Sequence, residues 1–430
     1  MLKKSSLHIN LDLREEDLDQ LFEPFDPLRQ ASTGDTLPPL PPSDTPFDPI
    51  DWDYLEAALS HFISDIAHHY FRGRIIGADK LPEEGPLIVA PNHSGNAFPH
   101  DAMVLDALLW QAQGFRRDTK FRSVFSPKLA ATWWMRPFAL DNWWRRAGGV
   151  DMTFANYNAL LRRGDKVIYY PEGVPGIGKG FLKRYQLQHF YSSFVVLAAR
   201  HNAPIFPVSV VNAEWVNPTS VTFDPINKLF DKLLGLPFFP VPIVFLAFLF
   251  PFLFYLAFPC KMVFVIGDPI DVRALFEEEG NRHHQEPDRE TVLRVAERIR
   301  QASQRLLDAA VAKYGHRPYD LEDLRHHLRQ VRGRVFRTIP LGWPYAFIQH
   351  DRNRQRPPAR HRLHAFLRDL DILVYFLPLG WFLLALLRRL RKPPCGYRGL
   401  TKTERIEREG AYRWSLATRP LPEKENTAPP

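Results

Sequence analysis

The chain has 430 residues, of which 45% are hydrophobic and 13% aromatic, so it is too long and too apolar to be wholly disordered. Its formal net charge of +8 predicts an anionic partner, either nucleic acid or an acidic membrane surface. The two cysteines, Cys260 and Cys395, lie far apart in unlike sequence contexts, which argues against a disulfide framework and against a zinc site.

Residues 1–50 are polar and end in a proline-rich stretch, so we expect a disordered tail that packs no core. They contain no apolar segment followed by a cleavage site, so we expect no signal peptide and a cytoplasmic catalytic part. From Asp51 onward, apolar residues recur at helical spacing, which predicts an amphipathic helix that packs on a core. This apolar stripe comprises Trp52, Leu55, Leu59, Phe62, Ile63, Ile66 and Tyr70.

Short apolar runs that end at turn residues predict strands at residues 74–77, 87–90, 166–170, 205–211 and 262–266. Helical stretches alternate with these strands, which predicts a layered α/β domain with a mixed sheet flanked by helices. We place this domain at residues 51–315. Its last helix is expected at residues 288–313, with Asp288 as the N-cap.

Residues 233–260 carry no charge and are long enough to cross a bilayer, for which about 20 apolar residues suffice. Prolines interrupt the run and would break the hydrogen bonds of a spanning helix, so we expect a surface segment that contacts lipid or lines an acyl pocket. These prolines are Pro237, Pro240, Pro242, Pro251 and Pro259.

Basic stretches alternate with apolar stretches in residues 316–418, which predicts a helical, membrane-associating extension. Within it, residues 372–387 are free of charge, rich in Leu and Phe, and followed directly by Arg388 and Arg389. This segment is slightly short for a span, so we expect either an interfacial or re-entrant anchor at an acidic leaflet or a buried helix. Residues 419–430 are charged and proline-rich, and we expect them to be disordered.

A first group of candidate functional residues follows the strand predicted at residues 87–90, where the chain passes into a helix. His93 is the candidate general base, because an imidazole can take a proton from a hydroxyl when a carboxylate orients the ring. Asp101, in the first turn of the helix after Pro99, is the candidate carboxylate. Asn92, Ser94 and Gly95 flank the histidine, and we expect them to contact substrate.

A second group follows the strand predicted at residues 166–170. Gly173 allows the backbone to approach a ligand closely, and Glu172 can hydrogen-bond the hydroxyls of a substrate. Three basic residues come next, which we place on one helical surface where they could hold a phosphate. They are Lys179, Lys183 and Arg184.

Residues 173–179 also match the G-x-x-x-x-G-K phosphate loop, so a nucleotide-binding protein is an alternative. Gly180 stands where a magnesium-binding Ser or Thr belongs, and Pro175 lacks an amide that would cradle phosphate, so we favour other functions. The histidine pairs are adjacent in sequence and no Cys or Glu completes a metal-binding pattern, so we expect no metal and no other cofactor. The basic cluster at residues 352–362 belongs to no nucleic-acid-reading module, which favours a membrane surface over nucleic acid as the partner.

The order of these features resembles the phospholipid and glycerol acyltransferase family, which includes the 1-acylglycerol-3-phosphate acyltransferases. The resemblance covers roughly residues 71–270 and rests on three blocks, Asn92–His93, Pro171–Gly173 and Ala203–Val208. It implies transfer of a fatty acyl group from acyl-CoA or acyl carrier protein to a hydroxyl of a glycerolipid such as a lysophospholipid or 1-acylglycerol-3-phosphate. It also implies a membrane-associated protein at the cytoplasmic face, in a bacterium at the inner membrane.

The spacing around the histidine differs from that of the family, in which an aspartate follows after four intervening residues. Here the first carboxylate is that of Asp101, after seven intervening residues. We therefore expect His93 as the base with Asp101 orienting its ring, and His100 with Asp106 as the alternative pair.

Acceptor recognition differs as well, because the arginine with which the family often binds the acceptor phosphate is absent from residues 149–156. Phosphate recognition then depends on Lys179, Lys183 or Arg184. A neutral acceptor, such as diacylglycerol or a long-chain alcohol, is an alternative, and so is a non-catalytic lipid-binding module.

Overall fold

The computed structural model describes residues 50–96, 98–125, 147–152, 154–221, 249–280, 287–355 and 370–390, with Trp144, Leu246, Ala247 and Leu367 in addition. The tails predicted at residues 1–50 and 419–430 lie outside these residues, except for Ile50.

A seven-stranded mixed sheet forms the centre of the fold, with the strand order β1-β7-β6-β2-β5-β3-β4. All neighbouring pairs are parallel except β6 and β7, which are antiparallel. This confirms the predicted mixed sheet. The strands are β1 (Arg74–Ile76), β2 (Leu87–Pro91), β3 (Arg122–Phe125), β4 (Val150–Asp151), β5 (Lys166–Ile168), β6 (Ile205–Val211) and β7 (Val263–Ile266).

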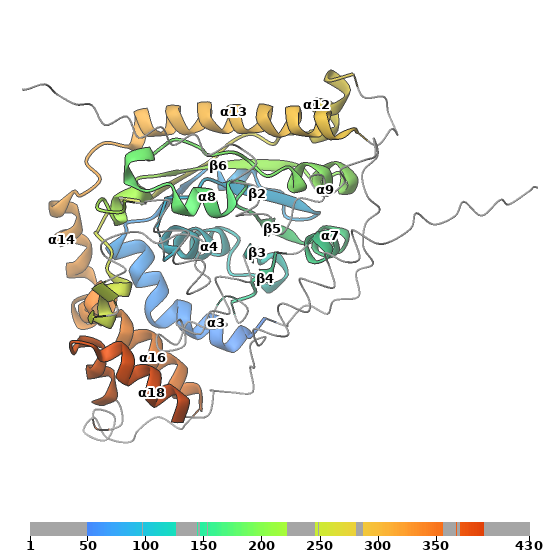
Figure 1. Cartoon of the computed structure of the whole chain (residues 1–430). Coiled ribbons are helices and arrows are strands. Elements are labelled where there is room, and N and C mark those ends of the chain that lie inside the picture. The colour runs from blue at the N-terminus through green and yellow to red at the C-terminus, as the bar shows by residue number, and fades with distance from the viewer. Residues whose placement is uncertain are drawn as a thin grey trace, which may run out of the picture.

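Helices cover both faces of this sheet, because alternate residues of each central strand point to opposite sides. In β2, Leu87 and Val89 belong to one buried cluster, whereas Ile88 and Ala90 belong to another. The second cluster lies under α13, which runs along the sheet beside α9 (Figure 1). Its helices are α7 (Phe154–Arg162), α9 (Ser193–His201), α12 (Val272–Glu278) and α13 (Arg289–Tyr314). Asp288 caps α13 by accepting a hydrogen bond from the Thr291 amide at 2.8 Å, as predicted.

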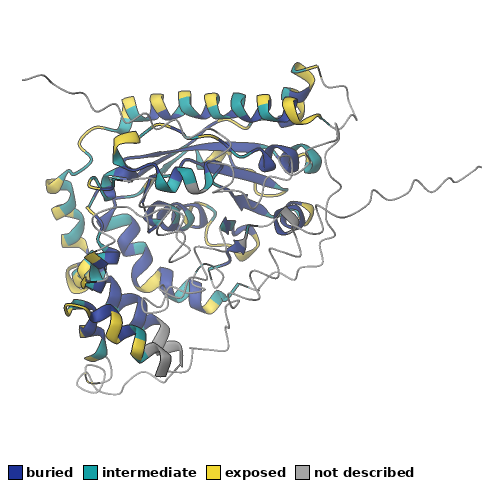
Figure 2. Ribbon diagram, viewed as in Figure 1, coloured by how far each residue is buried: buried dark blue, intermediate teal, exposed yellow. Residues whose placement is uncertain are grey.

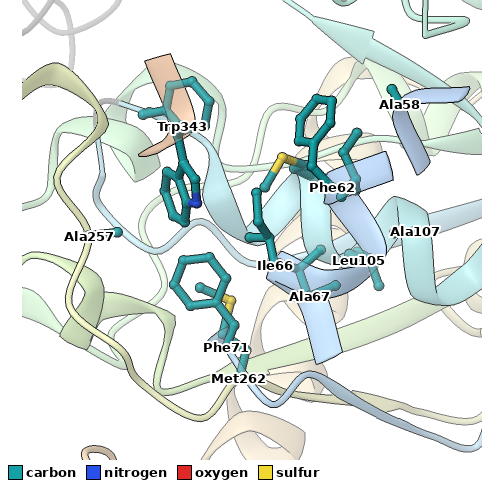
Figure 3. Close-up of a cluster of buried hydrophobic side chains, with 14 of the residues drawn as sticks. Ala58, Phe62, Ile66, Ala67, Phe71, Leu105, Ala107, Ala257, Met262 and Trp343 are labelled. Carbon is teal, nitrogen blue, oxygen red and sulfur yellow. The ribbon is translucent and has the colours of Figure 1, made fainter. Parts of the chain in front are cut away.

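The first cluster contains the predicted N-terminal amphipathic helix. It begins as α3 (Trp52–Ala58) and continues through two π-helical segments, η1 (Leu59–Ile63) and η2 (Ile66–Tyr70). The predicted apolar stripe is buried except for the half-buried Trp52, so it packs on a core, as predicted. The helix packs against α4 (His100–Ala112), and the Phe71 ring lies 5.9 Å from that of Trp343 in the C-terminal part, with Phe62 and Ile66 in the same cluster (Figure 3).

The described part of the predicted extension is helical and shares this first cluster. Trp343, Phe347, Tyr375 and Trp381 are all buried in it. The elements are α14 (Leu321–Gln330), η9 (Arg332–Arg334), α15 (Val335–Thr338), η10 (Pro340–Gly342), α16 (Trp343–Gln355), η11 (Leu370–Phe376) and α18 (Gly380–Leu390).

The uncharged segment at residues 372–387 is divided between η11 and α18, with a turn at Leu379, whose φ is 56°. Part of the proline-rich stretch forms the 3₁₀ turn η8 (Pro251–Tyr255). Among the helices that the structure describes, none is both long and apolar enough to cross a membrane. Other short 3₁₀ turns are η3 (Ala78–Lys80), η4 (Arg117–Thr119), η6 (Phe181–Lys183) and η7 (Ala213–Val216).

Candidate active site

The two predicted motifs meet at the carboxyl edge of the sheet. β2 and β5 are parallel neighbours, with Val89 opposite Ile168, so both strands end on the same side. The loop with His93 follows β2, and the loop with Glu172 follows β5 and leads into the short helix α8 (Gly173–Gly178). Ligands of open α/β sheets bind at such edges.

Glu172 joins the two loops through its carboxylate. Oε1 accepts a hydrogen bond from the His93 amide at 2.8 Å, and Oε2 accepts one from the Gln188 amide at 2.7 Å. The side chain is completely buried, so no substrate hydroxyl can reach it without rearrangement. In this structure Glu172 positions the backbone of His93, and its binding of substrate hydroxyls stays a prediction.

The His93 imidazole lies between an aromatic ring and a helix. It stacks on Tyr170 with a centroid distance of 4.3 Å and an interplanar angle of 19°. On α8, a Cβ at Gly176 would lie 2.9 Å from His93 Cδ2, so glycine permits this close approach. Burial and the nearby Lys179 ammonium lower the pKa of His93 to about 3. The half-buried ring is therefore neutral at physiological pH, which is the form that a general base requires.

Asp101 is the second residue of α4 and is buried. The Ser94 side chain hydrogen-bonds its carboxylate, while Oδ2 has no hydrogen-bond partner among the residues described. Burial raises the pKa of Asp101, although the Ser94 hydrogen bond acts in the opposite direction. The pairing of Asp101 with His93 stays a prediction, and the unpaired Oδ2 leaves capacity for it.

The other residues that flank His93 are held by the protein itself. Asn92 bonds the β6 backbone, accepting from the Val210 amide at 2.7 Å and donating to its carbonyl at 3.4 Å. Ser94 Oγ accepts a hydrogen bond from Asn96 at 2.9 Å. Asn92 and Ser94, which we expected to contact substrate, are both buried and act here as positioning residues. The backbone of Gly95, with φ of 71°, passes against Lys179 and Gly180.

Lys179 lies beneath these loops at the end of α8, not on the surface. Its Nζ is 3.4 Å from Oε1 of Glu214, and both side chains are fully buried. The ammonium also lowers the pKa of Asp101 and of Glu172, although burial raises the pKa of both carboxyls overall. One buried cation thus faces several carboxylates at the base of the site.

The structure contradicts the expectation that Lys179, Lys183 and Arg184 lie on one helical surface. Gly180, with φ of 68°, turns the chain after Lys179 into η6. Lys183 and Arg184 are exposed, and the Arg184 guanidinium lies over the Phe181 ring at 4.8 Å. Lys183 and Arg184 stay candidates for phosphate contact, whereas Lys179 is committed to its buried ion pair.

The same geometry argues against the phosphate-loop alternative. Residues 173–178 form α8 rather than an open loop, and the Lys179 ammonium points to a carboxylate. At Gly173, whose φ is 55°, an added Cβ would lie 2.6 Å from the ring of Tyr191, so this glycine approaches protein rather than free space. Within the described parts of the chain, no group of three His, Cys, Asp or Glu side chains is placed to hold a metal ion.

The alternative pair, His100 with Asp106, is separated by α4 itself. His100 points into the core, where its ring lies 4.5 Å from Phe98 and 5.4 Å from Trp343. Asp106 lies on another face of the helix and forms an ion pair with Lys120. Residues six positions apart on a helix point about 120° away from each other, so these two side chains lie on different faces and do not form a pair.

Two residues of the site carried no assigned role in the sequence. Glu214 follows β6, which neighbours β2, so the rule that places sites at strand ends could have found it. Tyr170 precedes the Pro171–Gly173 block, and its hydroxyl is buried without a hydrogen-bond partner in the described structure. Burial raises the pKa of Tyr170, and the nearby Asp101 and Asp106 raise it further.

Comparison with known proteins places the same segment in a family. Residues 72–211 match the family model described as Acyltransferase. An uncharacterized protein of Mycobacterium tuberculosis (strain H37Rv) is 30% identical over 215 residues, which are 50% of this chain and 55% of that protein. An uncharacterized protein of Mycobacterium leprae is 30% identical over 215 residues, covering 50% of this chain and 53% of that protein. The chain spans about half the length of the curated relatives it matches.

Among solved structures, the chain resembles the 1-acyl-sn-glycerophosphate (LPA) acyltransferase PlsC from Thermotoga maritima. The TM-score is 0.32 and the sequence identity 16%, over 61% of this chain and 84% of that one. The family match at residues 72–211 includes His93, Asp101 and Glu172. The segment that matches the Acyltransferase family model is thus the part of the chain that carries the candidate site.

Proposed function

We propose that the protein transfers a fatty acyl group from acyl-CoA or acyl carrier protein to a hydroxyl of a glycerolipid acceptor, a lysophospholipid or 1-acylglycerol-3-phosphate. The observation that carries this proposal is the placement of a neutral imidazole, that of His93, at the carboxyl edge of the sheet. Glu172 fixes its backbone at 2.8 Å and Tyr170 stacks on its ring. The match of residues 72–211 to the Acyltransferase family model supports the reaction class.

In this reaction the His93 ring removes the proton of the acceptor hydroxyl as the oxygen attacks the thioester carbonyl. The carbon–sulfur bond then breaks, and the departing thiolate takes the proton from the imidazolium. Because the pKa of His93 is lowered to about 3, forming the imidazolium is unfavourable without a nearby negative charge. Asp101 is suited to supply this charge, because its Oδ2 has no other partner in the described residues.

Lys183 and Arg184 support an anionic acceptor. Both are exposed and follow the Glu172 loop closely in the chain, so a phosphate could approach them from solvent. A neutral acceptor such as diacylglycerol is the second candidate, because the family's arginine is absent from residues 149–156.

The test is transfer of radiolabelled acyl groups from acyl-CoA and, separately, from acyl carrier protein to a panel of acceptors. The panel contains lysophospholipids, 1-acylglycerol-3-phosphate and diacylglycerol. We expect His93→Gln to lose activity by about 10²-fold or more, which is the usual contribution of a general base. The matched control is His100→Gln, since His100 is a neighbouring histidine that is buried in the core. Full activity in His93→Gln would contradict the proposal.

A second pair of variants tests the acceptor. Lys183→Gln with Arg184→Gln should raise the KM for 1-acylglycerol-3-phosphate and leave the KM for diacylglycerol unchanged. Equal effects on the two acceptors would exclude these residues as phosphate ligands.

We infer further that the protein acts at the cytoplasmic face of a bacterial inner membrane. Its proposed acceptors are bilayer lipids, and both curated relatives described above are bacterial. Fractionation of cells that express the full chain, followed by protease protection, tests this location. Recovery outside the membrane fraction, or on its far side, would contradict it.

A further inference from the structure

Helices α16 and α18 lie at the end of the molecule opposite α13 (Figure 1), and α18 has exposed residues along its length (Figure 2). Ten of the 16 exposed large apolar residues in the described chain fall within residues 246–249 and 367–386. These two segments touch: the Leu379 amide donates to the Leu249 carbonyl at 2.6 Å, and Phe252 stacks on Phe376 at 5.4 Å. We call the exposed side chains of these segments the C-terminal apolar patch.

Helix α18 shows why this patch requires a partner. Its inner face buries Trp381 and Leu384 in the core. Its outer face exposes 61% of Phe382, 42% of Leu383 and 53% of Leu386. A helix that is apolar on both sides is normally covered on both sides, and a contiguous apolar surface on a folded protein marks a binding site.

The charges around the patch identify its partner. Among the residues of η11 and α18 whose burial the structure describes, the exposed ones are apolar, and in the sequence four of the five residues at positions 388–392 are Arg or Lys. An apolar surface followed in the chain by a basic cluster matches the interface of a bilayer with acidic headgroups. The following chain is a poor cover for the patch, because 14 of the 40 residues at positions 391–430 are charged.

We propose that the C-terminal apolar patch docks the protein onto an anionic bilayer, with its leucines and phenylalanines in the interfacial region. The helix lies on the membrane rather than across it, because α18 has 11 residues and a span needs about 20. This inference deepens the proposed function. Docking itself does not depend on acyl transfer, and only its purpose, access to lipid acceptors, rests on the proposed function.

Aromatic contacts connect the patch to the candidate active site. Phe252 belongs to η8 and stacks on Phe376 of η11, the element that contributes Leu370 and Leu373 to the patch. In the same turn, Phe254 contacts Phe98 edge-on at 5.7 Å, and Phe98 lies in the loop between His93 and Asp101. A protein docked through this patch therefore has lipid a few side chains away from the loop that carries the candidate base.

The test measures sedimentation of the full chain with vesicles of equal parts phosphatidylcholine and phosphatidylglycerol, and with vesicles of phosphatidylcholine alone. We expect the wild type to bind the anionic vesicles, more weakly at high salt. Leu386→Glu should weaken binding at least about tenfold, and Phe382→Glu with Leu386→Glu should weaken it further. The matched control is Leu321→Glu on α14, because Leu321 is 58% exposed and Leu386 is 53% exposed.

Several outcomes would overturn the inference. They are failure of the wild type to bind the anionic vesicles, equal loss in Leu386→Glu and Leu321→Glu, and no loss in the double variant. Light scattering without lipid tests a second copy as the occupant: a dimer that Leu386→Glu dissociates would also overturn the inference.

Acyl transfer to acceptors dispersed in detergent separates the docking inference from the proposed function. Retained transfer by Leu386→Glu, together with lost vesicle binding, supports both. Patch-dependent vesicle binding by a wild type that transfers no acyl group would support docking and contradict the proposed function.

Discussion

Charged side chains occur in two contrasting settings in this protein, beneath His93 and along the exposed side of α13. Beneath His93, Lys179 and Glu214 pair at 3.4 Å with both side chains fully buried. On α13, Arg294 contacts Glu279 at 3.0 Å and Glu290 at 2.8 Å, while 44% of its side chain is exposed to solvent. Water screens the second group, whereas the first group has exchanged its hydration for protein contacts.

This difference in burial distinguishes charged groups that hold the site in place from charged groups that lie only on the surface. Each buried carboxylate beneath His93 accepts backbone amides: Glu172 those of His93 and Gln188, and Glu214 that of Tyr185. These bonds fix loops that come from distant parts of the chain. The Arg294 pairs join α13 to Glu279 and to Glu290 of its own first turn, and these partners lie outside the site.

The largest effect is expected from removing the buried cation. Lys179→Met leaves Glu214 and Glu172 buried without a counter-charge, which should lower the free energy of unfolding by about 3–5 kcal/mol. Urea denaturation of the full chain measures this change. Arg294→Met is the matched surface control, and it should leave the denaturation midpoint unchanged within error.

A double variant makes this comparison sharper. Glu214→Gln added to Lys179→Met removes the uncompensated charge and keeps an acceptor for the Tyr185 amide, so it should recover part of the lost stability. If both substitutions destabilise the protein additively, the buried pair is not coupled, and the contrast with α13 fails.

Glu172→Gln should have the next largest effect. The amide group of glutamine turns a donor toward one of two backbone amides, so we expect a loss of about 1–3 kcal/mol in the free energy of unfolding. Displacement of His93 should also lower kcat about ten- to hundredfold, with little change in KM. Glu290→Gln, at the exposed pair with Arg294 on α13, is the control.

The split between kcat and KM decides the role of Glu172. A raised KM for the acceptor with unchanged kcat would show that Glu172 binds substrate, as its position in the sequence first indicated. Lowered kcat with unchanged KM would identify a positioning residue.

The third prediction concerns pH. A base acts in its neutral form, and the pKa of His93 is lowered from 6.5 to about 3. The free enzyme therefore keeps a neutral imidazole as the pH falls below 6.5, and the acid limb of kcat/KM should lie well below that value. His100→Gln should leave the limb in place. An acid limb centred near pH 6.5 would mean that His93 is solvated like a free histidine or that another group is the base.

The sequence predicted the fold where apolar runs are continuous and missed it where they are short. The predicted strands correspond to β1, β2, β5, β6 and β7. β3 begins with Arg122–Ser123 and β4 has two residues, so neither gives an apolar run that sequence analysis can detect.

The same limit applies to the site. The two motif loops meet because β2 and β5 are parallel and end at the same edge of the sheet, and the order of strands and motifs in the sequence can predict this. The direction in which each side chain points cannot be predicted from that order. Lys179 and Lys183 are four residues apart, but the turn at Gly180 leaves the first buried and the second exposed. Asn92 and Glu172 have the polarity of ligands, but backbone amides and carbonyls of the protein already satisfy them.

The smallest effect is expected at Tyr170, where a buried polar group lacks the bonds that hold its neighbours. Tyr170→Phe keeps the ring that stacks on His93 and removes a hydroxyl without a hydrogen-bond partner in the described structure. Because an unpaired buried hydroxyl is unfavourable, this variant should be as stable as the wild type or more stable by up to about 1 kcal/mol. Tyr170→Leu, which removes the stacked ring, should instead lower kcat. A clear loss of stability in Tyr170→Phe would show that the hydroxyl is bonded in solution, with Asp101 or Asp106 as the candidate acceptor. Tyr170 would then belong with Glu172 among the groups that hold the site in place.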